Sequence, residues 1–299
     1  MREVSVPVDR FLIYLQHEKR YSPHTVQAYR TDLDQFEQYI KDTYAETLIS
    51  VSTVHVRSFM VTLMDNGISA NAVNRKISSL RSFYKFLQQN GLLQQNPMQL
   101  IKAPKVPKRL PVFIEAHKLD QLLDSAEIFT DDFASQRDRA VIELLFGTGI
   151  RLAELLQLKD TDINRYDRVV KVLGKRSKER VVPLHNELLQ LLEGYITLKE
   201  KQDFNKKSLN LILTNTGAPA YPKLIYRIVK NYLSMISTQD KKSPHVLRHS
   251  FASSLLDRGA DLNAIKELLG HAGLAATQIY THSSVERLKS IYKQAHPKA

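Results

Sequence analysis

Arg151 and Glu154 form the first constellation in the sequence whose types and spacing could do chemistry. Arg151 stands in the segment TGIRLAE, where Gly149 is expected to make a turn that delivers the arginine to the start of a helix. Glu154 follows three residues later, and residues three apart share a helix face, so the carboxylate could hold the guanidinium. Taken alone, such a pair is more often only surface support for a helix.

A second arginine, Arg248, lies in the segment HVLRHSFA, directly after the helix-start signal Ser243-Pro244. His245 precedes it by three residues and is therefore expected on the same helix face. A guanidinium offers fork-shaped donors to a phosphate, and an imidazole adds a donor or a group that titrates near neutral pH. A metal site is disfavoured here, because the adjacent guanidinium would repel a cation.

Three further side chains are candidates for chemistry, and two of them, Lys175 and Tyr280, also have a simpler explanation. Lys175 follows Gly174 in a turn, where a solvated lysine is as reasonable as a functional one. His271 follows Gly270, which is expected to end a helix and leave the imidazole at an exposed break. Tyr280 comes nine residues after His271. A tyrosine near the end of a helical domain usually serves in packing.

The composition points to a polyanionic partner without identifying it. The chain has 43 Lys and Arg against 31 Asp and Glu, a formal net charge of +12. This charge attracts polyanions, but it does not separate DNA from RNA or from an acidic membrane, and a merely solvated basic surface is an alternative. Two runs concentrate basic residues: Lys102, Lys105, Lys108 and Arg109 in one, and Lys171, Lys175, Arg176, Lys178 and Arg180 in the other.

The absence of cysteine excludes several classes of protein. The 299 residues contain none, so disulfide scaffolds, thiolate metal sites, iron–sulfur clusters and thiol nucleophiles are ruled out. Any nucleophile must be an oxygen, a nitrogen or a water molecule.

No apolar stretch is long enough to span a bilayer, and the first residues lack the pattern of a secretory signal. We therefore expect a soluble, cytoplasmic protein.

Two domains are predicted on either side of a proline-rich stretch. Residues 104–111 hold three prolines and three basic residues, and each proline favours extended backbone before it, so this stretch is expected to be a linker. Residues 1–103 show four amphipathic helical patterns. The fourth carries Arg75, Lys76 and Arg81 opposite its apolar side, which predicts a helical domain with one basic face.

The C-terminal domain, 112–299, combines helices with a hairpin. Apolar spacing predicts helices over 135–146, 151–157, 186–202, 222–237, 244–258, 261–269, 274–281 and 284–294. β-Branched residues at 168–173 and 179–184 predict a hairpin, and 209–213 is expected to add a strand. The predicted fold class is mainly α, with a four-helix N-terminal domain and a mostly helical C-terminal domain that holds a small antiparallel sheet.

Taken in order, the segments TGIRLAE, GKRSKER, HVLRH, LGHAG and IYTH resemble the motifs of the tyrosine recombinases of the phage integrase family. The early segment SPHTVQAYRTDL is similar to the SAM-like, DNA-gripping core-binding domain of the Xer-type members. The resemblance covers nearly the whole chain, and the order and spacing of the segments are specific. It implies that a scissile DNA phosphate lies among five residues and is attacked by Tyr280; the five are Arg151, Lys175, His245, Arg248 and His271. Arg176 departs from the glycine that such turns often carry.

The residue types suit the transesterification that the resemblance implies. A phenol with a pKa of about 10 is ionised in about one molecule in a thousand at pH 7, so nearby cations must favour the phenolate. Arg151 and Arg248 would bind the phosphoryl oxygens, with His271 as a further donor. His245 would assist proton transfer at the nucleophile, and Lys175 would protonate the departing 5′ oxygen. The 3′-phosphotyrosine product conserves the bond energy, so no cofactor, ATP or metal is required.

The resemblance also implies partners. The substrate is double-stranded DNA with a specific recombination site, acted on by a homo-tetramer or by a hetero-tetramer with a second recombinase; a DNA translocase of the FtsK type is a further partner. Neither a membrane nor a small-molecule substrate is expected. The predicted DNA contacts are basic residues of the fourth helix, the linker and the hairpin: Arg75, Lys76, Arg81, Lys105, Lys108, Arg109, Arg176 and Lys178.

The C-terminal tail has two alternative positions. Val285, Leu288, Ile291 and Tyr292 follow a helical spacing. This apolar side could pack on a neighbouring subunit of the expected tetramer or on the core of its own chain.

Several functions share these features. The leading one is resolution of chromosome dimers at a dif-like site during chromosome segregation. An integrase or excisionase of a phage or conjugative element shares the catalytic domain, and a topoisomerase shares the covalent chemistry without a defined site. A DNA-binding protein without catalysis is the alternative from another class, and a covalent adduct with nicked DNA that depends on Tyr280 would separate it from the others.

Overall fold

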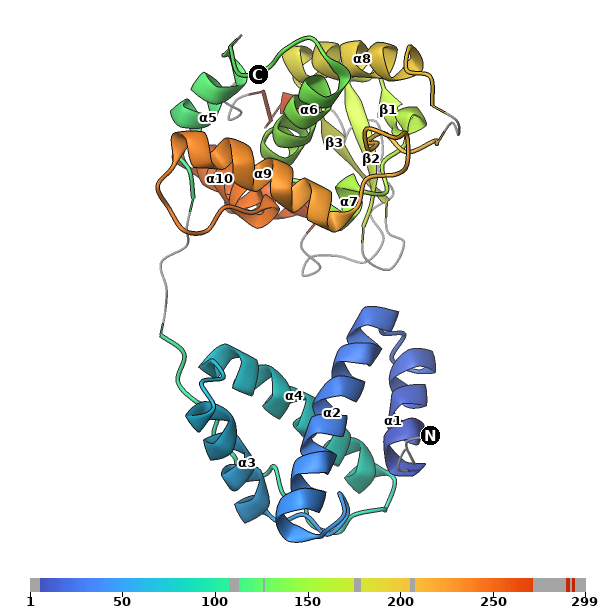
Figure 1. Cartoon of the computed structure of the whole chain (residues 1–299), viewed down its shortest axis with the longest axis vertical. Coiled ribbons are helices and arrows are strands. Elements are labelled where there is room, and N and C mark those ends of the chain that lie inside the picture. Colours follow the sequence, from blue (N-terminus) through green and yellow to red (C-terminus); the bar gives the residue numbers. More distant parts are fainter. Residues whose placement is uncertain are drawn as a thin grey trace. The chain divides into compact units, whose positions relative to one another are not determined.

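The computed structural model describes residues 6–107, 113–125, 127–174, 179–204, 208–270, 289–290 and 292–293. The chain divides into two compact units, Met1–Arg109 and Leu110–Ala299, at a point inside the stretch 104–111 that its prolines mark as a linker. Each unit has a hydrophobic core of its own. The helices and strands of both units are labelled in Figure 1. Among the described residues, no helix is both long and apolar enough to cross a membrane.

The first unit is built from α-helices. They are α1 (Val6–His17), α2 (Pro23–Tyr44), α3 (Thr53–Asp65) and α4 (Ala70–Gln89). The start of α2 is capped: the Ser22 hydroxyl accepts a hydrogen bond from the Thr25 N–H at 3.2 Å, and Pro23 occupies the first turn. Phe11 of α1 packs edge-on against Phe83 of α4, with ring centroids 5.4 Å apart, inside the core.

A buried carboxylate joins α2 to α4. Asp32 has no exposed surface and accepts hydrogen bonds from Arg75 Nη1 at 2.5 Å, Lys76 Nζ at 3.1 Å and Ser79 Oγ at 2.8 Å. The prediction that Lys76 lies on an exposed basic face is therefore wrong, since its ammonium turns inward to Asp32 and only 8% of the residue is exposed. Arg75 keeps about half of its side chain exposed while it binds the same carboxylate.

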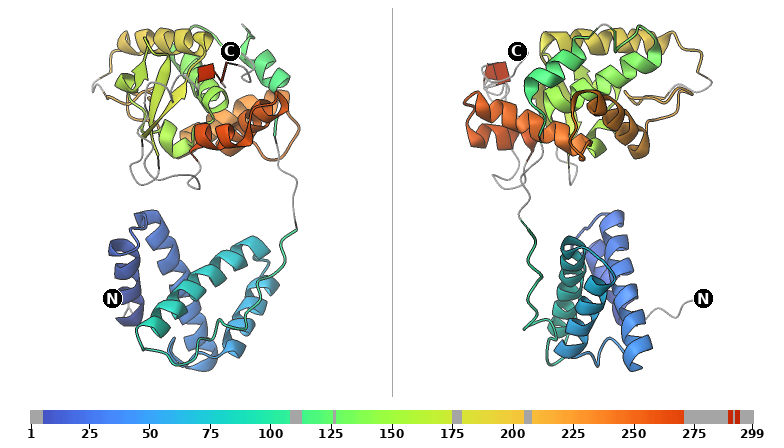
Figure 2. Two further views of the ribbon diagram at one scale, coloured as in Figure 1. Left: turned by 180° about the vertical axis from the view of Figure 1, so that it is seen from behind. Right: turned by 60° about the vertical axis from the view of Figure 1, so that its left-hand side comes forward.

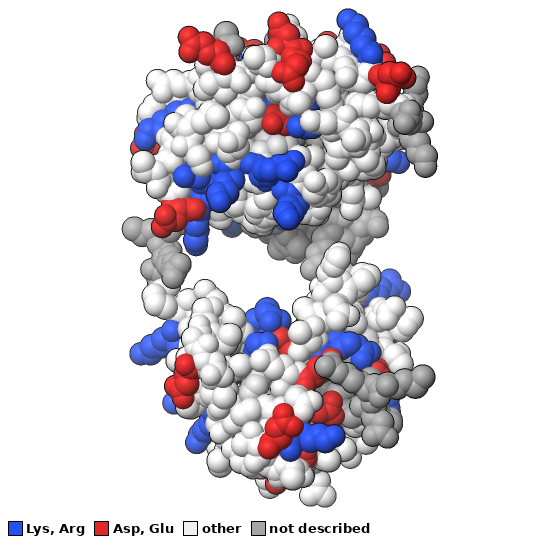
Figure 3. Space-filling view, in the orientation of Figure 1, with Lys and Arg blue, Asp and Glu red and all other residues white. Residues whose placement is uncertain are grey.

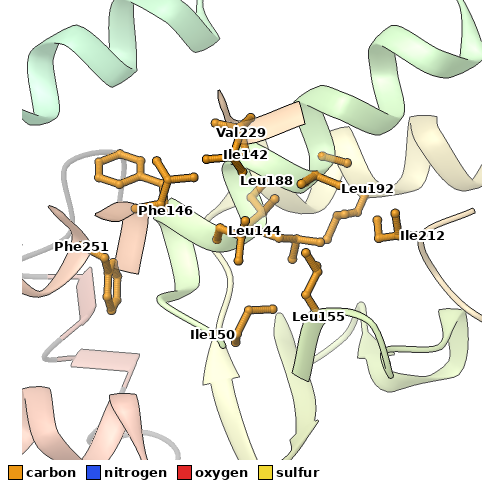
Figure 4. Close-up of a cluster of buried hydrophobic side chains, with 14 of the residues drawn as sticks. Ile142, Leu144, Phe146, Ile150, Leu155, Leu188, Leu192, Ile212, Val229 and Phe251 are labelled. Atoms are coloured by element: carbon orange, nitrogen blue, oxygen red, sulfur yellow. The ribbon is translucent and has the colours of Figure 1, made fainter. Parts of the chain in front are cut away.

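The second unit packs helices around a single core (Figures 1 and 2). Its helices are α5 (Ala116–Leu123), α6 (Phe133–Thr148), α7 (Leu152–Leu155), α8 (Asn186–Glu200), α9 (Pro222–Ile236), α10 (Pro244–Asp257) and α11 (Leu262–Leu269). The eight-residue α5 was not predicted from the sequence. Helix α6 lies at the centre, in contact with α7, α8, α9 and α10. Its side chains Ile142, Leu144 and Phe146 point into the core beside Leu188 of α8 and Phe251 of α10 (Figure 4).

The small antiparallel sheet contains the predicted hairpin. After the 3-10 turn η1 (Asp160–Asp162), the strands β1 (Ile163–Asn164), β2 (Val169–Leu173) and β3 (Glu179–Pro183) pair in the order β1-β2-β3. Val170 of β2 lies opposite Val182 of β3, and both are buried in the core of the unit. The hairpin prediction is confirmed, and the fold class is as expected: mainly helical, with a small three-stranded sheet in the second unit.

The prediction of a strand over 209–213 is wrong. In the part of the chain that the structure describes, this segment forms only single bridges, from Lys159 to Asn210 and from Leu213 to Pro219. Its buried backbone groups find separate partners instead: the Leu211 N–H donates to the Leu158 carbonyl at 2.7 Å, and the Leu213 N–H to the hydroxyl of buried Tyr195 at 3.3 Å. A short apolar run indicates burial, but burial does not require a ladder when other acceptors are within reach.

Tyr292 of the C-terminal tail packs in the core of its own unit. Its ring is buried, and its hydroxyl donates to the Gly147 carbonyl at the end of α6, at 2.7 Å. Of the two positions open to the tail, this side chain therefore occupies the one within its own chain. Val285, Leu288 and Ile291 lie outside the described residues.

Candidate active site

The turn after α6 brings the first predicted residue into place. Gly149 ends the helix with a left-handed φ of 61°, and its N–H donates to the Leu145 carbonyl at 3.2 Å. A Cβ at this position would lie 2.4 Å from a ring carbon of Phe251 and 2.9 Å from Leu269. Glycine is therefore required both for the turn and for the close approach of α10 and α11. The chain then enters α7, with Arg151 as its N-cap.

Glu154 holds Arg151 through two hydrogen bonds. Its Oε2 accepts from the Arg151 backbone N–H at 2.7 Å, and its Oε1 accepts from Arg151 Nη1 at 2.9 Å. The contact expected from the three-residue spacing is present, and the carboxylate also closes the first turn of α7. Glu154 is buried, whereas 37% of the Arg151 side chain is exposed, so a buried carboxylate holds the guanidinium while part of the side chain stays open to solvent.

Arg180 of β3 binds the same carboxylate from the other side. Its Nη1 and Nη2 donate to Glu154 Oε1 and Oε2, both at 2.8 Å, in a bidentate pair. The sequence placed Arg180 in a run of basic residues, but the structure buries it, with 5% of the residue exposed. Its role in the site was missed, because the partner carboxylate lies 26 positions away in the chain.

Arg248 of α10 completes the group. Its Nη1 donates to the Gly149 carbonyl and its Nη2 to the Leu269 carbonyl at 2.6 Å, so it links the α6 turn to the end of α11. The residue is 9% exposed. Arg151, Arg180 and Arg248, together with Glu154, are called the arginine cluster below.

All three arginines converge on the C-terminal end of α11. Arg180 Nε donates to the carbonyl of Leu268 at 3.1 Å, and Arg151 Nη2 donates to that of Gly270 at 3.1 Å, on either side of the Leu269 carbonyl bound by Arg248. The last carbonyls of a helix lack partners within the helix and carry its partial negative charge. Cationic donors therefore stabilise this end of α11. Its C-cap, Gly270, directly precedes His271 in the sequence.

The charges in the cluster oppose one another, and the pKa values show it. Burial alone would raise the pKa of Glu154, but the hydrogen bond and charge of Arg180, followed by the hydrogen bonds from Arg151, outweigh burial and hold the pKa below its ordinary value. Burial first, and then the charges of Arg151 and Arg180, lower the pKa of Arg248 to about 10, while Glu154 acts in the opposite direction. Three guanidinia around one carboxylate leave positive charge at the site, which favours an anion.

Of the remaining predicted catalytic residues, one lies in the described part of the chain and three lie outside it. His245 is exposed in the first turn of α10, three residues before Arg248 and on the predicted helix. Lys175, His271 and Tyr280 lie outside the described residues. Their roles stay predictions.

A group with metal-ligand spacing occurs elsewhere in the second unit. Ligand atoms of Glu143, His185 and Glu187 lie within 4.8 Å of one another. Nδ1 of His185 accepts a hydrogen bond from the Leu188 N–H at 3.3 Å, which places the proton of the neutral imidazole on Nε2, 3.7 Å from Glu143 Oε1. A metal ion on Nε2 would have to displace that proton. We therefore interpret the group as a histidine–carboxylate contact that fixes the start of α8.

The predicted DNA contacts fall into three sets. Arg81 is exposed and donates to the Ile101 carbonyl at 2.6 Å, and Lys105 is exposed. Arg75 is half-exposed beside Asp32, and the burial of Lys76 removes it as a surface contact. The others lie outside the described residues: Lys108, Arg109, Arg176 and Lys178.

Comparison with known proteins supplies the family. The model of the phage integrase family matches residues 112–287, and that of the phage integrase N-terminal SAM-like domain matches residues 8–91. The chain belongs to the phage integrase family. It is 36% identical over 317 residues to a tyrosine recombinase XerC of Chlorobaculum parvum, covering 98% of this chain and 94% of that protein. It is 34% identical over 293 residues to a tyrosine recombinase XerD of Staphylococcus haemolyticus, covering 98% and 99%.

A solved structure supports the same fold. A XerH site-specific recombinase bound to palindromic difH substrate, in a post-cleavage complex, superimposes with a TM-score of 0.72 at 22% identity, covering 95% of this chain and 83% of that one. The recognition of a tyrosine recombinase from the sequence motifs is confirmed. As a member of this family the protein is an enzyme that cleaves and rejoins DNA.

The recombinase has a further basic surface that the sequence analysis did not single out. Helix α9 exposes Lys223, Arg227 and Lys230, which are four and three residues apart and so share one face. Its opposite face is buried, including Ile225 and Val229. In Figure 3, which keeps the orientation of Figure 1, Lys and Arg side chains gather on the part of the second unit that α9 occupies. The four- and three-residue spacing of the basic residues was the signal in the sequence.

Proposed function

We propose that this tyrosine recombinase is an Xer-type enzyme that resolves chromosome dimers at a dif-like site during chromosome segregation. Full-length similarity to XerC and XerD proteins supports the Xer type. The basic surfaces and the net charge of +12 favour a duplex DNA substrate. Because recombination joins two duplexes, the enzyme would act as a tetramer on two sites, of one kind of subunit or of two, with a DNA translocase as a further partner.

The observation that carries the proposal is the convergence of Arg151 and Arg248 on the end of α11. Both guanidinia are held by protein oxygens through part of their donors, Arg151 by Glu154 and Gly270 and Arg248 by Gly149 and Leu269. A guanidinium has five N–H donors, so each keeps others for a phosphate. Fixed donors in a partly buried site cost little reorganisation when charge develops on the phosphoryl oxygens.

The proposed reaction exchanges one phosphate ester for another. The Tyr280 phenolic oxygen bonds to phosphorus, the bond from phosphorus to the 5′ oxygen breaks, and the DNA 3′ end becomes a phosphotyrosine. His245 assists removal of the phenolic proton, and Lys175 gives a proton to the departing 5′ oxygen. Arg151, Arg248 and His271 bind the non-bridging oxygens. Attack by another 5′ hydroxyl reverses the step on a new strand, so the number of ester bonds is conserved.

The DNA contacts would come from both units. The first unit supplies cations at or near its surface from Arg75 and Arg81 of α4 and from Lys105. In the second unit, helix α9 supplies Lys223, Arg227 and Lys230. Lys108, Arg109, Arg176 and Lys178 remain candidates. We do not propose a direct contact for Lys76, whose ammonium is bound to Asp32.

Nicked suicide DNA tests the chemistry. Such a substrate carries a break just beside the scissile phosphate, so the short 5′-hydroxyl fragment diffuses away and the covalent complex accumulates. We expect a covalent protein–DNA band with the wild-type chain and none with Tyr280→Phe, at unchanged DNA affinity. Tight binding without an adduct at any site tested would instead favour a DNA-binding protein without catalysis.

The chromosomal role requires a separate test. Covalent adducts of the wild-type enzyme, trapped in host cells and mapped by sequencing, should concentrate at one locus in the replication-terminus region. Cells that lack the gene should accumulate chromosome dimers and filaments. Adducts confined to the ends of a mobile element would contradict the proposal in favour of an integrase, and adducts without a defined site would favour a topoisomerase.

A further inference from the structure

Arg180 is the most enclosed member of the arginine cluster. Only 5% of the residue is exposed, compared with 9% for Arg248, and its side chain is 6% exposed, compared with 37% for Arg151. Three of its N–H groups are engaged by Glu154 and by the Leu268 carbonyl. Its guanidinium also fills the space beside Gly270, where a Cβ would lie 3.2 to 3.3 Å from the Arg180 side chain. With Nε and both Nη atoms already bound to protein acceptors in this enclosed position, Arg180 is a poor candidate for direct contact with a DNA phosphate.

The contacts of Arg180 lead instead to two parts of the site. Through Glu154 it reaches Arg151, because each oxygen of that carboxylate accepts one bond from Arg180 and one from Arg151. Through Leu268 it reaches the end of α11, three residues before His271. A single planar side chain of β3 thus ties the start of α7 to the end of α11.

We propose that Arg180 is a positioning residue of DNA cleavage: it locks the Glu154 carboxylate in the orientation that aims Arg151 at the scissile phosphate, and it anchors the end of α11, which precedes His271 in the sequence. The inference rests on the proposed assignment of Arg151 and His271 to that phosphate. Arg180 itself touches neither substrate nor nucleophile.

The planar fork of arginine is essential to this role. Glu154 is buried and needs donors on both oxygens, and a bidentate guanidinium supplies two in one fixed plane while its Nε remains directed at Leu268. A lysine would keep the positive charge but concentrate its donors on one atom. The carboxylate could then rotate toward the ammonium and carry Arg151 with it. Displacement of a catalytic group by about 1 Å can cost on the order of a hundredfold in rate.

Arg180→Lys tests the proposal, and Arg137→Lys is its matched control. Arg137 is equally enclosed in the same unit, with 5% of its side chain exposed, and it likewise binds a carboxylate, that of Asp138. It also donates to Asn215 Oδ1 at 2.5 Å. The full-length variants are compared in thermal unfolding, in affinity for a duplex recombination site and in single-turnover adduct formation on the nicked substrate, at a temperature where both are folded.

We expect Arg180→Lys to lower the adduct rate by on the order of a hundredfold with DNA affinity within about threefold of wild type. Arg137→Lys should lose comparable thermal stability yet cleave at nearly the wild-type rate. In an Arg151→Lys background, the substitution of Arg180 should cost clearly less than a further hundredfold, because the part of its effect that passes through Arg151 is already lost. If Arg180→Lys does not fold, Glu154→Gln supplies the second reading, with the same loss of rate at retained affinity.

Three outcomes would overturn the proposal. They are wild-type cleavage by folded Arg180→Lys, an equal loss of rate in the Arg137 control, or a full hundredfold loss added to that of Arg151→Lys. Normal cleavage by Glu154→Gln would overturn it as well. The absence of an adduct with the wild-type enzyme is a different result, since it would refute the proposed function before the variants are compared.

Discussion

Replacing Gly149 by alanine should strongly destabilise the second unit, because the new methyl group meets both an unfavourable backbone conformation and a filled core. Alanine in the left-handed region costs about 1–2 kcal/mol, and here φ is 61°. The new Cβ would also lie 2.4 Å from Phe251 and 2.9 Å from Leu269, which are buried and must shift, and overpacking of this kind typically costs about 1–3 kcal/mol. Together these effects predict a loss of about 2–5 kcal/mol in the free energy of unfolding.

Two other glycines of the same unit separate the contributions. Gly259 has a φ of 82° but open space around a new Cβ, so Gly259→Ala should show the backbone cost alone, about 1–2 kcal/mol. Gly194 lies exposed inside α8, also with open space, so Gly194→Ala should stabilise by about 0.5–1 kcal/mol. The predicted order of stability is thus Gly194→Ala above wild type, then Gly259→Ala, then Gly149→Ala.

Urea unfolding followed by hydrogen exchange and mass spectrometry measures this order. Peptides from α6 report on the second unit, and peptides from α4 in the same sample serve as the internal reference, because the first unit keeps its own core. A Gly149→Ala variant within about 0.5 kcal/mol of wild type would refute the reasoning entirely. Equal losses for Gly149→Ala and Gly259→Ala would refute the packing argument and leave only the backbone cost.

Three further substitutions give independent tests. Asp32→Asn should cost about 3–5 kcal/mol in urea unfolding, since it leaves the buried Lys76 ammonium without its carboxylate, whereas Asp42→Asn on the exposed side of the same helix should stay within about 0.5 kcal/mol. The folded-state pKa of Glu154 lies below the ordinary 4.5, so the contribution of this carboxylate to stability is present above that pH and is lost as the pH falls through the folded value. Glu154→Gln should therefore be less stable than wild type at neutral pH and should lose less stability on acidification. An unchanged pH dependence in urea melts would contradict this. Arg248→Lys should form adduct on nicked DNA at least about a hundredfold more slowly although the charge is kept, because one ammonium cannot span the Gly149 and Leu269 carbonyls and a phosphate; wild-type rates would remove Arg248 from the site.

Features written in adjacent residues could be predicted from the sequence. The cap at Ser22, the glycine that ends α6 and the contact between Arg151 and Glu154 each depend on side chains within a few positions of one another, so local spacing decides them. The hairpin of β2 and β3 is similarly local. The motifs around Arg151 and Arg248 are 97 positions apart, and only their resemblance to a family indicated that they meet.

Features that depend on a distant carboxylate were missed. Lys76 and Arg180 both stand in basic runs, and their chemical type alone predicts exposure. Each is buried because a carboxylate from another element meets it, Asp32 of α2 in one case and Glu154 of α7 in the other. A signal existed for the first: Asp32 precedes Leu33 and falls on the apolar side of its helix, so an internal cation was required.

Repulsion among the three guanidinia of the arginine cluster explains why backbone carbonyls bind them. Two of the three guanidinia bind the single carboxylate of Glu154, and burial together with repulsion from these two lowers the pKa of the third, Arg248, to about 10. The carbonyls of Leu268, Leu269 and Gly270 offset part of this repulsion, because they present the negative end of the α11 dipole to the three side chains. Partial charges cannot cancel full ones, so an uncompensated field remains at the exposed edge of Arg151. If the scissile phosphodiester binds here as proposed, its negative charge grows during the transfer, and it should relieve this repulsion most at the point where charge develops.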